Sequence, residues 1–226
     1  MMWKNTCRAF VFSSMLLLTA CASTTNEPSA PNSAPPPANA SVEGSSQSSD
    51  PAFQSSLSLC PLTSVSNAPE TRDGLRIISY RQFVDIGGVK IAVAPVEKAC
   101  LSSGFGARSS GTHKGIDLHN ASAVAVYAAA AGEVREKYYR EDYGNMVVLD
   151  HGNGVFTRYA HLESFASGLG VGDKLNAGDD LGVMGNTASY TIPRHLHYEV
   201  LTGQWGTQAG SFALSPVDIF QRLPDN

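Results

Sequence analysis

The sequence has few charged residues and no run of basic ones. Charged residues make up 16% of the 226-residue chain, and the formal net charge is −4. Nucleic-acid-binding proteins gather Lys and Arg on one surface, so this mildly acidic chain is not expected to bind nucleic acid. The apolar stretch at residues 9–18 is shorter than the roughly 20 apolar residues that span a bilayer. The composition therefore argues against a multi-span membrane protein.

Several common enzyme signatures are also absent from the sequence. The patterns H-E-x-x-H, G-x-S-x-G and the phosphate loop do not occur, so the enzyme classes that they mark lack support. The chain does have 42% hydrophobic residues, enough for a folded core, and 21 glycines, of which 17 lie from residue 104 onward. Frequent glycines without a persistent helical period favour β structure.

The N-terminus has the features of an export signal. Lys4 and Arg8 accompany a short apolar stretch, as expected of a secretion signal over residues 1–20. Residues 18–21, Leu-Thr-Ala-Cys, resemble the lipobox of bacterial lipoproteins. The resemblance implies cleavage before Cys21, lipid attachment to its sulfur, and an anchor in the cell envelope, with the outer membrane facing the periplasm as the favoured location. A plain soluble secretory signal is the alternative.

Two further segments precede the glycine-rich region. Residues 21–58 are expected to hold the lipidated cysteine and a linker, because positions 22–58 contain eleven serines and six of the twelve prolines. A segment of this composition buries too little apolar surface to fold by itself. Residues 59–100 are expected to form an N-terminal β extension. This extension either packs on the sheet that follows it or covers a substrate groove, and the sequence does not choose between the two.

The cysteines favour a disulfide over redox or catalytic chemistry. Cys7 leaves with the signal and Cys21 carries lipid, so Cys60 and Cys100 remain as an even pair. Such a pair forms a disulfide in an oxidising compartment such as the periplasm. The absence of a C-x-x-C spacing argues against a redox motif. A thiol hydrolase that uses Cys60 or Cys100 is a minor alternative.

Short β-rich runs predict a mainly β fold with an antiparallel sheet over residues 101–226. In the extension before it, Gly87-Gly88 is a tight-turn signal between two strand-like segments, which predicts a hairpin. Ser215-Pro216 has the form of a helix start, so a short C-terminal helix is expected to reach about Leu223. The expected strands of the main sheet are Val124–Ala130, Glu133–Tyr139, Asn145–Asp150, Val155–His161, Leu181–Met184 and His195–Leu201.

The histidines carry the strongest chemical signal. All six lie beyond residue 112, and His113 stands four residues before Asp117. His195 and His197 lie in an alternating run, so their imidazoles share one face of a strand. His161 ends another expected strand. Each pattern alone also fits a purely structural histidine, but two imidazoles on one strand face are suited to forming half of a metal site.

Taken in order, these patterns resemble the lysostaphin-type zinc endopeptidases, which cut peptidoglycan cross-links. The carrying motifs are H-x-x-x-D at 113–117, Y-A-H-L at 159–162 and H-L-H at 195–197, and the resemblance covers most of residues 95–222. It implies a β-sheet peptidase fold with a substrate groove. It also implies peptidoglycan stem peptides as substrate, with a D-alanyl–meso-diaminopimelate cross-link as the expected bond. Further matching segments lie at 103–108, 143–145, 151–154, 171–173, 177–179 and 185–187.

Carried over by position, the resemblance makes His113, Asp117 and His197 the ligands of one Zn²⁺ ion. Two imidazoles and one carboxylate leave a fourth coordination position open for water. The resemblance makes His161 and His195 the catalytic pair. We expect His195 to take a proton from water and His161 to orient water or steady the tetrahedral intermediate, although the two roles are exchangeable at this stage.

The substrate groove is less well defined by the sequence. Asn145, Tyr159 and Arg194 are expected to line it, and Arg194 is a candidate partner for a stem-peptide carboxylate. Arg194 lies in a stretch that replaces the family's usual glycine-rich approach to H-L-H with bulkier residues. Glu199 either supports a histidine from behind or is a solvated strand residue, and His151, in a Gly/Asn turn, is expected to be structural.

A second function class competes with hydrolysis. Some exported relatives are non-catalytic lipoproteins that activate cell-wall amidases after losing zinc ligands. Because all five site positions are filled in this chain, an active enzyme is the favoured interpretation. Bound zinc without release of peptide products would favour the activator instead.

Overall fold

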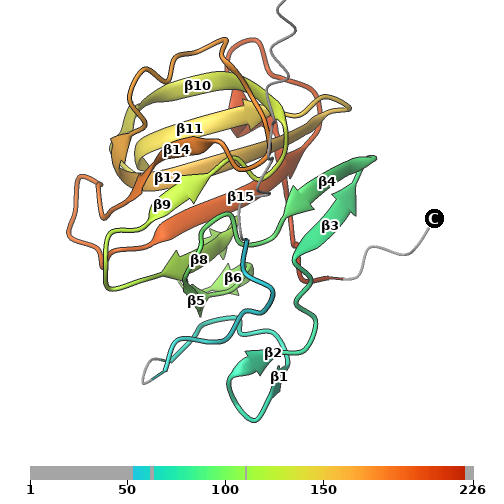
Figure 1. Ribbon diagram of the computed structural model, residues 1–226, viewed down its shortest axis with the longest axis vertical. Coiled ribbons are helices and arrows are strands. Elements are labelled where there is room, and N and C mark those ends of the chain that lie inside the picture. Colours follow the sequence, from blue (N-terminus) through green and yellow to red (C-terminus); the bar gives the residue numbers. More distant parts are fainter. Residues whose placement is uncertain (1–52, 62–63, 110, 222–226) are drawn as a thin grey trace, which may run out of the picture. The chain divides into compact units, whose positions relative to one another are not determined.

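An antiparallel sheet of ten strands dominates the computed structural model (Figure 1), which describes residues 53–61, 64–109 and 111–221. The expected mainly β, antiparallel fold is confirmed. The predicted signal, the lipidated Cys21 and most of the predicted linker lie outside the described residues. The main order is β13 (Lys174–Leu175), β10 (Gly132–Arg140), β11 (Gly144–Asp150), β12 (Val155–Phe165), β15 (Leu196–Thr202), β8 (Ile116–His119) and β5 (Cys100–Ser103).

The remaining strands attach to this order or form small hairpins. β14 (Asp180–Met184) pairs with both β12 and β9 (Ala125–Tyr127), and β16 (Ser215–Val217) pairs with β15. The eleven-residue strand β12 is long enough to pair with β15 through its first half and with β14 through its second. The hairpins are β1 (Thr71–Arg72) with β2 (Arg76–Ile77), β3 (Phe83–Ile86) with β4 (Val89–Ala92), and β6 (Gly106–Arg108) with β7 (Gly111–His113).

The two faces of the sheet are covered differently. Alternate residues of a strand point to opposite faces, and on β15 Tyr198 and Val200 join the larger apolar cluster while Leu201 joins a smaller one. On β12, Tyr159 belongs to the larger cluster and Phe156 to the smaller. We call the face with the larger cluster and Tyr198 the core face. The opposite face, which carries His197 and Glu199, is the site face.

The N-terminal extension packs on the core face. Ile77, Ile86 and Ile91 belong to the same buried cluster as Tyr198, so this extension covers the face opposite to His197. The predicted hairpin is confirmed as β3–β4, and Gly87 and Gly88 supply its turn at φ values of 59° and 80°. Of the two arrangements left open by the sequence, packing on the sheet is the one that the structure shows for these residues.

The folded part begins earlier than the sequence predicts. Phe53 and Leu57 are 5% and 1% exposed, and the ring of Phe53 packs edge-on against Phe83 and Tyr127. The predicted linker end at residue 58 is therefore too late for residues 53–58. The misplacement has a simple cause: two isolated apolar side chains in a serine-rich stretch give no periodic signal, yet each fills a gap in the core.

Cys60 and Cys100 form the expected disulfide. It joins the extension to β5, beside which Leu59 pairs in parallel with Leu101. Both sulfurs are used in this bond, which removes the basis for a thiol hydrolase at either cysteine. Because β5 pairs with β8, the disulfide anchors the extension next to the strand that carries Asp117.

The expected C-terminal helix from Ser215 is wrong for the described residues up to 221. Ser215–Val217 instead forms β16, with Val217 opposite Val200. Pairing with β15 satisfies the backbone groups there and buries neighbouring Leu214 and Ile219, which outweighs the helix-start pattern. Only the 3-10 turn η1 (Ser211–Ala213) precedes it. In the described segments we find no helix with the length and apolarity needed to cross a membrane.

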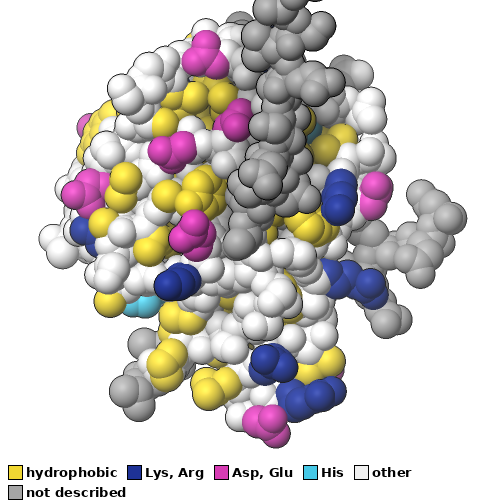
Figure 2. Space-filling model, in the orientation of Figure 1, with side chains coloured by type: hydrophobic (Ala, Val, Ile, Leu, Met, Phe, Trp, Pro, Cys, Tyr) yellow, Lys and Arg dark blue, Asp and Glu magenta, His cyan; other side chains and the backbone are white. Residues whose placement is uncertain are grey.

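The described surface carries both signs of charge. Figure 2 shows acidic side chains spread over the upper part of the view and basic ones mostly in its lower part. On the site face, by contrast, several charged groups are buried, among them Arg158 at 1% and Glu199 at 0% exposure. The distribution of charge that matters for chemistry is therefore internal.

Candidate functional site

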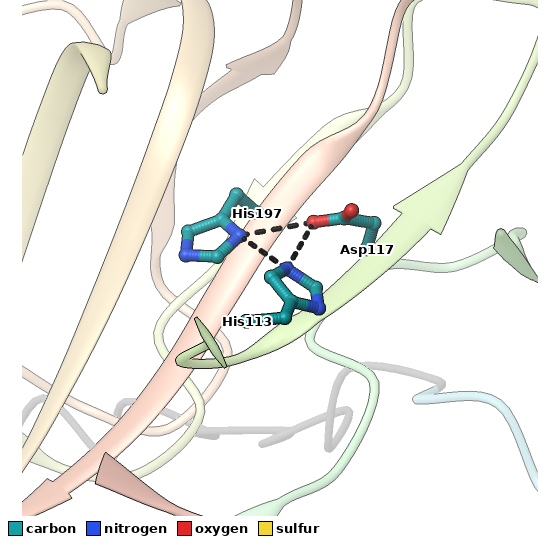
Figure 3. A group of neighbouring side chains, drawn as sticks. All are labelled: His113, Asp117 and His197. Atoms are coloured by element: carbon teal, nitrogen blue, oxygen red, sulfur yellow. Dashed lines mark hydrogen bonds and ion pairs between the residues drawn. The ribbon is translucent and has the colours of Figure 1, made fainter. Parts of the chain in front are cut away.

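Three side chains converge on one point of the site face (Figure 3). His113 Nε2 lies 3.0 Å from Asp117 Oδ1 and 3.0 Å from His197 Nδ1, and His197 Nδ1 lies 2.9 Å from Asp117 Oδ1. Each residue thus offers one donor atom to a nearly equilateral triangle. This is the only such group of at least three metal-ligating side chains found in the described part of the chain.

Strand pairing explains why residues 80 positions apart meet. His197 on β15 stands directly opposite Asp117 on β8, and His113 ends β7 just before the turn into β8. Gly115 makes this turn fit, because a Cβ there would lie 2.2 Å from the carbonyl oxygen of Tyr198. The H-x-x-x-D spacing and its glycine therefore have a geometric reason.

Each of the three metal-ligating side chains is oriented by a hydrogen bond at its other polar atom. His113 Nδ1 donates a hydrogen bond of 2.6 Å to the carbonyl of Gly104, and His197 Nε2 donates one of 2.9 Å to Glu199 Oε1. Arg108 Nη2 donates to Asp117 Oδ2 at 3.2 Å. These bonds leave one atom of each side chain for a metal, and the three atoms face one another: Nε2 of His113, Nδ1 of His197 and Oδ1 of Asp117. Outer partners of this kind fix ring orientation and tautomer in metal sites.

The donor set fits a small divalent metal ion such as zinc. Zinc binds imidazole nitrogen and carboxylate oxygen at about 2.0–2.2 Å, so tetrahedral donors stand about 3.3 Å apart. The observed separations of 2.9–3.0 Å need only a slight expansion. Three protein donors leave one tetrahedral position open, which is the arrangement of catalytic rather than structural zinc sites.

The electrostatics of the triangle favour a charged ligand set. Burial alone raises the pKa of Asp117, but hydrogen bonds from His113 and His197 outweigh it and hold that pKa well below its usual range. Burial lowers the pKa of His197, yet hydrogen bonds to Asp117 and Glu199 raise it to about 9 in the metal-free protein. A group of anions that attracts a proton this strongly is also suited to attract a cation.

His161 and His195 form a second pair beside the triangle. Their ring centroids are 4.8 Å apart, and His195 Nε2 lies 3.8 Å from Asp117 Oδ1. The Nδ1 atoms donate to carbonyls, at 2.8 Å to Thr187 and at 2.7 Å to Pro193, so each Nε2 is left without the ring's proton in the neutral form. Burial lowers both pKa values, that of His161 to about 4. Both rings are therefore neutral near pH 7.

His161 is held in a strained backbone conformation. Its φ is +61°, a left-handed value that non-glycine residues rarely adopt, and its N–H donates to the carbonyl of Tyr143 at 2.8 Å. Thr187 supports it from the adjoining loop, which packs so tightly on Gly144 that a Cβ there would lie 2.0 Å from the Thr187 carbonyl. Strain of this kind persists where the surroundings fix it, commonly at functional sites.

The three expected groove residues have other roles in the structure. Tyr159 is fully buried on the core face, where its hydroxyl accepts the N–H of Ala129, so its prediction as a groove residue is wrong. Arg194 Nη1 donates to Glu163 and to the carbonyl of Met184, and its contact with a substrate carboxylate stays a prediction. Asn145 is half-buried and donates to the carbonyl of Leu162, which holds β12 immediately after His161.

Sequence reasoning missed the residues behind the triangle. It gave no role to Arg108 or Arg158 and left Glu199 undecided, whereas the structure places all three in contact with the site or one residue away from it. Alternation along β15 already puts Glu199 on the face of His197, so that signal was available. The pairing of Glu199 with Arg158 depends on strand register, which the sequence does not display.

The remaining histidines and the main surface cavity lie elsewhere. His119 Nδ1 donates to the carbonyl of Arg194, and His151 Nδ1 donates to that of Ala131, so neither joins the triangle. A surface cavity of about 1300 Å³ is lined by residues 67–70, 78–81, 83–87, 105 and 217–221, and no histidine is among them. Geometry and donor chemistry, not cavity size, identify the site.

Comparison with known proteins agrees with this geometry. The chain is 36% identical over 147 residues to the DD-carboxypeptidase/endopeptidase Mpg of Neisseria meningitidis, covering 62% of this chain and 33% of that protein. It is 37% identical over 89 residues to the peptidoglycan DD-endopeptidase ShyA of Vibrio cholerae, covering 39% and 20%. It is 32% identical over 101 residues to the outer membrane antigenic lipoprotein B of Haemophilus influenzae, covering 44% and 24%. The chain thus spans a third or less of each relative's length.

One solved structure and one protein-family model also match part of this chain. The catalytic domain of lysostaphin from Staphylococcus simulans matches 50% of this chain and 86% of its own, with 23% identity and a TM-score of 0.43. Residues 111–209 match Peptidase family M23, and this span contains the triangle and both additional histidines. Residues 111–209 are therefore a domain of Peptidase family M23.

Proposed function

We propose that this chain is a zinc-dependent endopeptidase that hydrolyses peptide cross-links of peptidoglycan. One observation carries the proposal: donor atoms of His113, Asp117 and His197 lie 2.9–3.0 Å apart beside a pair of neutral histidines. The site belongs to a peptidase-family domain, and two of its relatives are named as DD-endopeptidases. A purely structural metal site would close its fourth position with another side chain.

The residues divide the chemical work between binding and proton transfer. A zinc ion held by the triangle would act as a Lewis acid and would lower the pKa of a bound water to about 7. His195 accepts the proton of the attacking water, because its Nε2 is directed to within 3.8 Å of Asp117 Oδ1. His161 lies beside His195, where the unprotonated Nε2 of its ring accepts a hydrogen bond from that water and orients it, and His195 then passes its proton to the departing amine.

The proposal also assigns the bond that is cut and the cellular location of the domain. The bond that we assign is the D-alanyl–meso-diaminopimelate cross-link, supported by relatives named for DD-endopeptidase activity. A lipid on Cys21 would place the domain in the cell envelope, and one relative is named as an outer membrane lipoprotein. The Cys60–Cys100 disulfide fits the oxidising periplasm.

Digestion of purified sacculi tests the reaction directly. The full chain is expected to release shortened muropeptides whose masses identify the severed bond, whereas His113→Ala releases none. His151→Gln is the matched control, since it removes a histidine that lies outside the triangle. Equal release by the wild type and by His113→Ala would contradict the proposal.

Metal analysis separates the proposal from its rival. The purified chain is expected to contain one zinc per molecule, to lose activity with a chelator and to regain it with added zinc. One bound zinc with no product from any cross-linked substrate would instead support a non-cleaving activator of cell-wall amidases. Unchanged cleavage after complete removal of metal would contradict the zinc mechanism.

A further inference from the structure

Next to His197, the site face holds a buried carboxylate with hydrogen-bond partners on both of its oxygens. Glu199 is 0% exposed, and its Oε1 accepts hydrogen bonds from His197 Nε2 at 2.9 Å and from the Tyr143 hydroxyl at 2.8 Å. Its Oε2 accepts from Arg158 Nη1, which stands directly opposite it on β12. Both oxygens of this buried anion therefore have protein partners.

Arg158 in turn is held from several sides. It is 1% exposed, its guanidinium lies 4.1 Å from the ring centroid of Phe212, and its Nη2 donates to Ser211 Oγ at 2.8 Å. Ser211 is also buried and donates to Glu136 Oε2 at 2.6 Å. A chain of contacts therefore runs from His197 through the buried pair to the loop before β16.

Stability alone does not account for a buried ion pair. Removing two charges from water carries a large desolvation penalty, and replacing such pairs with apolar residues of similar volume is often neutral or stabilising. The same face of the sheet also holds an apolar cluster that includes Phe156, Leu201 and Leu214, so charged groups are not the rule there. The retained charges call for another role.

The hydrogen bonds of the His197 imidazole indicate what this other role is. A neutral histidine has one N–H and one lone pair, and the atom that carries the proton is set by the stronger acceptor. When a metal replaces the second proton of His197, the Glu199 carboxylate keeps the remaining proton on Nε2 and leaves the Nδ1 lone pair on the side of Asp117 Oδ1 and His113 Nε2. Arg158 Nη1 donates to the other oxygen of that carboxylate and so holds it in place against His197.

We propose that Glu199 and Arg158 are positioning residues that fix the tautomer and orientation of His197 for metal binding. The inference rests on the metal site of the proposed function, but it concerns metal affinity and not cleavage. It assigns a role to a pair that touches neither the substrate nor the metal. Second partners of metal-bound histidines commonly change metal affinity by about 10- to 100-fold.

A double substitution separates positioning from stability. In Arg158→Met/Glu199→Leu both charges leave together, so the metal-free protein is expected to lose less stability than Arg158→Met, which leaves one charge of the pair buried. The zinc affinity of the double variant, measured by competition with a chelator, is expected to fall about 10- to 100-fold. The absorption spectrum of its Co²⁺ form is expected to change, because the ring of His197 is no longer held. Glu199→Gln should show the same loss of affinity.

Thr157→Val is the matched control. Thr157 is also fully buried on β12 and adjoins Arg158, but its hydroxyl bonds on the core face with Tyr159 and His151. This variant is expected to lose some stability and to bind zinc and Co²⁺ like the wild type. Wild-type zinc affinity and an unchanged Co²⁺ spectrum in the double variant would overturn the proposal.

Imidazole nitrogen NMR of the zinc-loaded wild type tests the same claim without any substitution, should the variants not fold. The expected result is a proton on Nε2 of His197 and metal on Nδ1, and the reverse assignment would overturn the proposal. These readouts are independent of cleavage. A wild type that binds zinc as expected but releases no muropeptide would reject the proposed function and leave the positioning role intact.

Discussion

Strand β12 supports two buried polar networks, one on each face, and they are built differently. On the site face, Arg158 joins the charged chain that runs through Glu199 to His197. On the core face, the neighbouring Thr157 lies 2.9 Å from the Tyr159 hydroxyl and 2.7 Å from His151 Nε2. The core network contains no fixed charge, whereas the site network consists largely of charged groups.

The difference shows what each network is for. A neutral hydrogen-bonded chain satisfies buried polar atoms and is compatible with an apolar core, so it needs no function to explain it. A buried charged chain is favourable only while every member is paired, since one unpaired charge is costly. Such a chain is therefore informative about chemistry, and it ends at the residue that we assign to the metal. Substitutions on the two faces should consequently change different measurements.

The largest expected effect is on the site face, at Asp117. Asp117→Asn removes the negative donor of the triangle, and with it the metal's contribution of several kcal/mol to the reaction. Cleavage of purified sacculi is expected to fall at least about 10⁴-fold, which corresponds to about 5 kcal/mol in the barrier. Thr157→Val, on the opposite face, should cleave at the wild-type rate. Retention of a tenth of the activity by Asp117→Asn would contradict the assignment.

Removing only one charge of the Arg158–Glu199 pair should lower the free energy of unfolding more than any change to the core network. Arg158→Met leaves Glu199 buried with His197 as its remaining cationic neighbour, and the loss of a buried charge partner costs up to about 3–5 kcal/mol. Urea unfolding of the metal-free protein measures this directly. A loss no greater than that of Thr157→Val would show that Glu199 is not ionised in the folded protein.

The core network should lower stability without affecting metal binding. Tyr159→Phe removes the acceptor of the Ala129 N–H, which lies 2.8 Å from the hydroxyl in a fully buried position. An unsatisfied buried backbone group costs about 1–3 kcal/mol, so the unfolding free energy should fall by that amount. Zinc affinity measured on the same sample should remain at the wild-type value. A drop in affinity would mean that the two faces are coupled through β12.

The sequence predicted some features of these two faces correctly and missed others. Alternation along 196–200 correctly separates His197 and Glu199 from the apolar set, and the three histidine motifs locate the triangle. Tyr159 was misplaced because alternation does not say which face of its strand is the core. The partners of Glu199 and of Asp117 were missed because they depend on register between strands, and register is set by the whole sheet.

Local signals failed where burial decided the outcome. The helix-start pattern at Ser215 is genuine, but a strand edge on β15 was available to pair with it. Phe53 and Leu57 lack any periodic neighbours, so nothing marked them as part of the folded region. In both cases a tertiary contact outweighed a local preference. The Cys60–Cys100 pairing was predictable because counting left only two cysteines.

The smallest expected effect concerns pH and the outer end of the core network. Burial lowers the pKa of His151, partly opposed by its bond to Ala131 and by the nearby Asp150 charge, so the folded state favours the neutral ring. Both folded and unfolded states hold that ring neutral above about pH 6.5. As the pH falls below that value the unfolded state takes up the proton first, so this contribution to stability is lost, by at most about 1.4 kcal/mol per pH unit.

His151→Gln isolates this contribution, because glutamine does not titrate. The difference in unfolding free energy between wild type and variant is expected to shrink from pH 7.5 to pH 5.5, measured by urea unfolding of the metal-free protein. The neutral ring donates from Nδ1 and leaves Nε2 to accept from Thr157, 2.7 Å away, and protonation removes that acceptor. A difference that grows toward acid pH would mean that the core network holds a charged imidazole, and the contrast between the faces of β12 would then be lost.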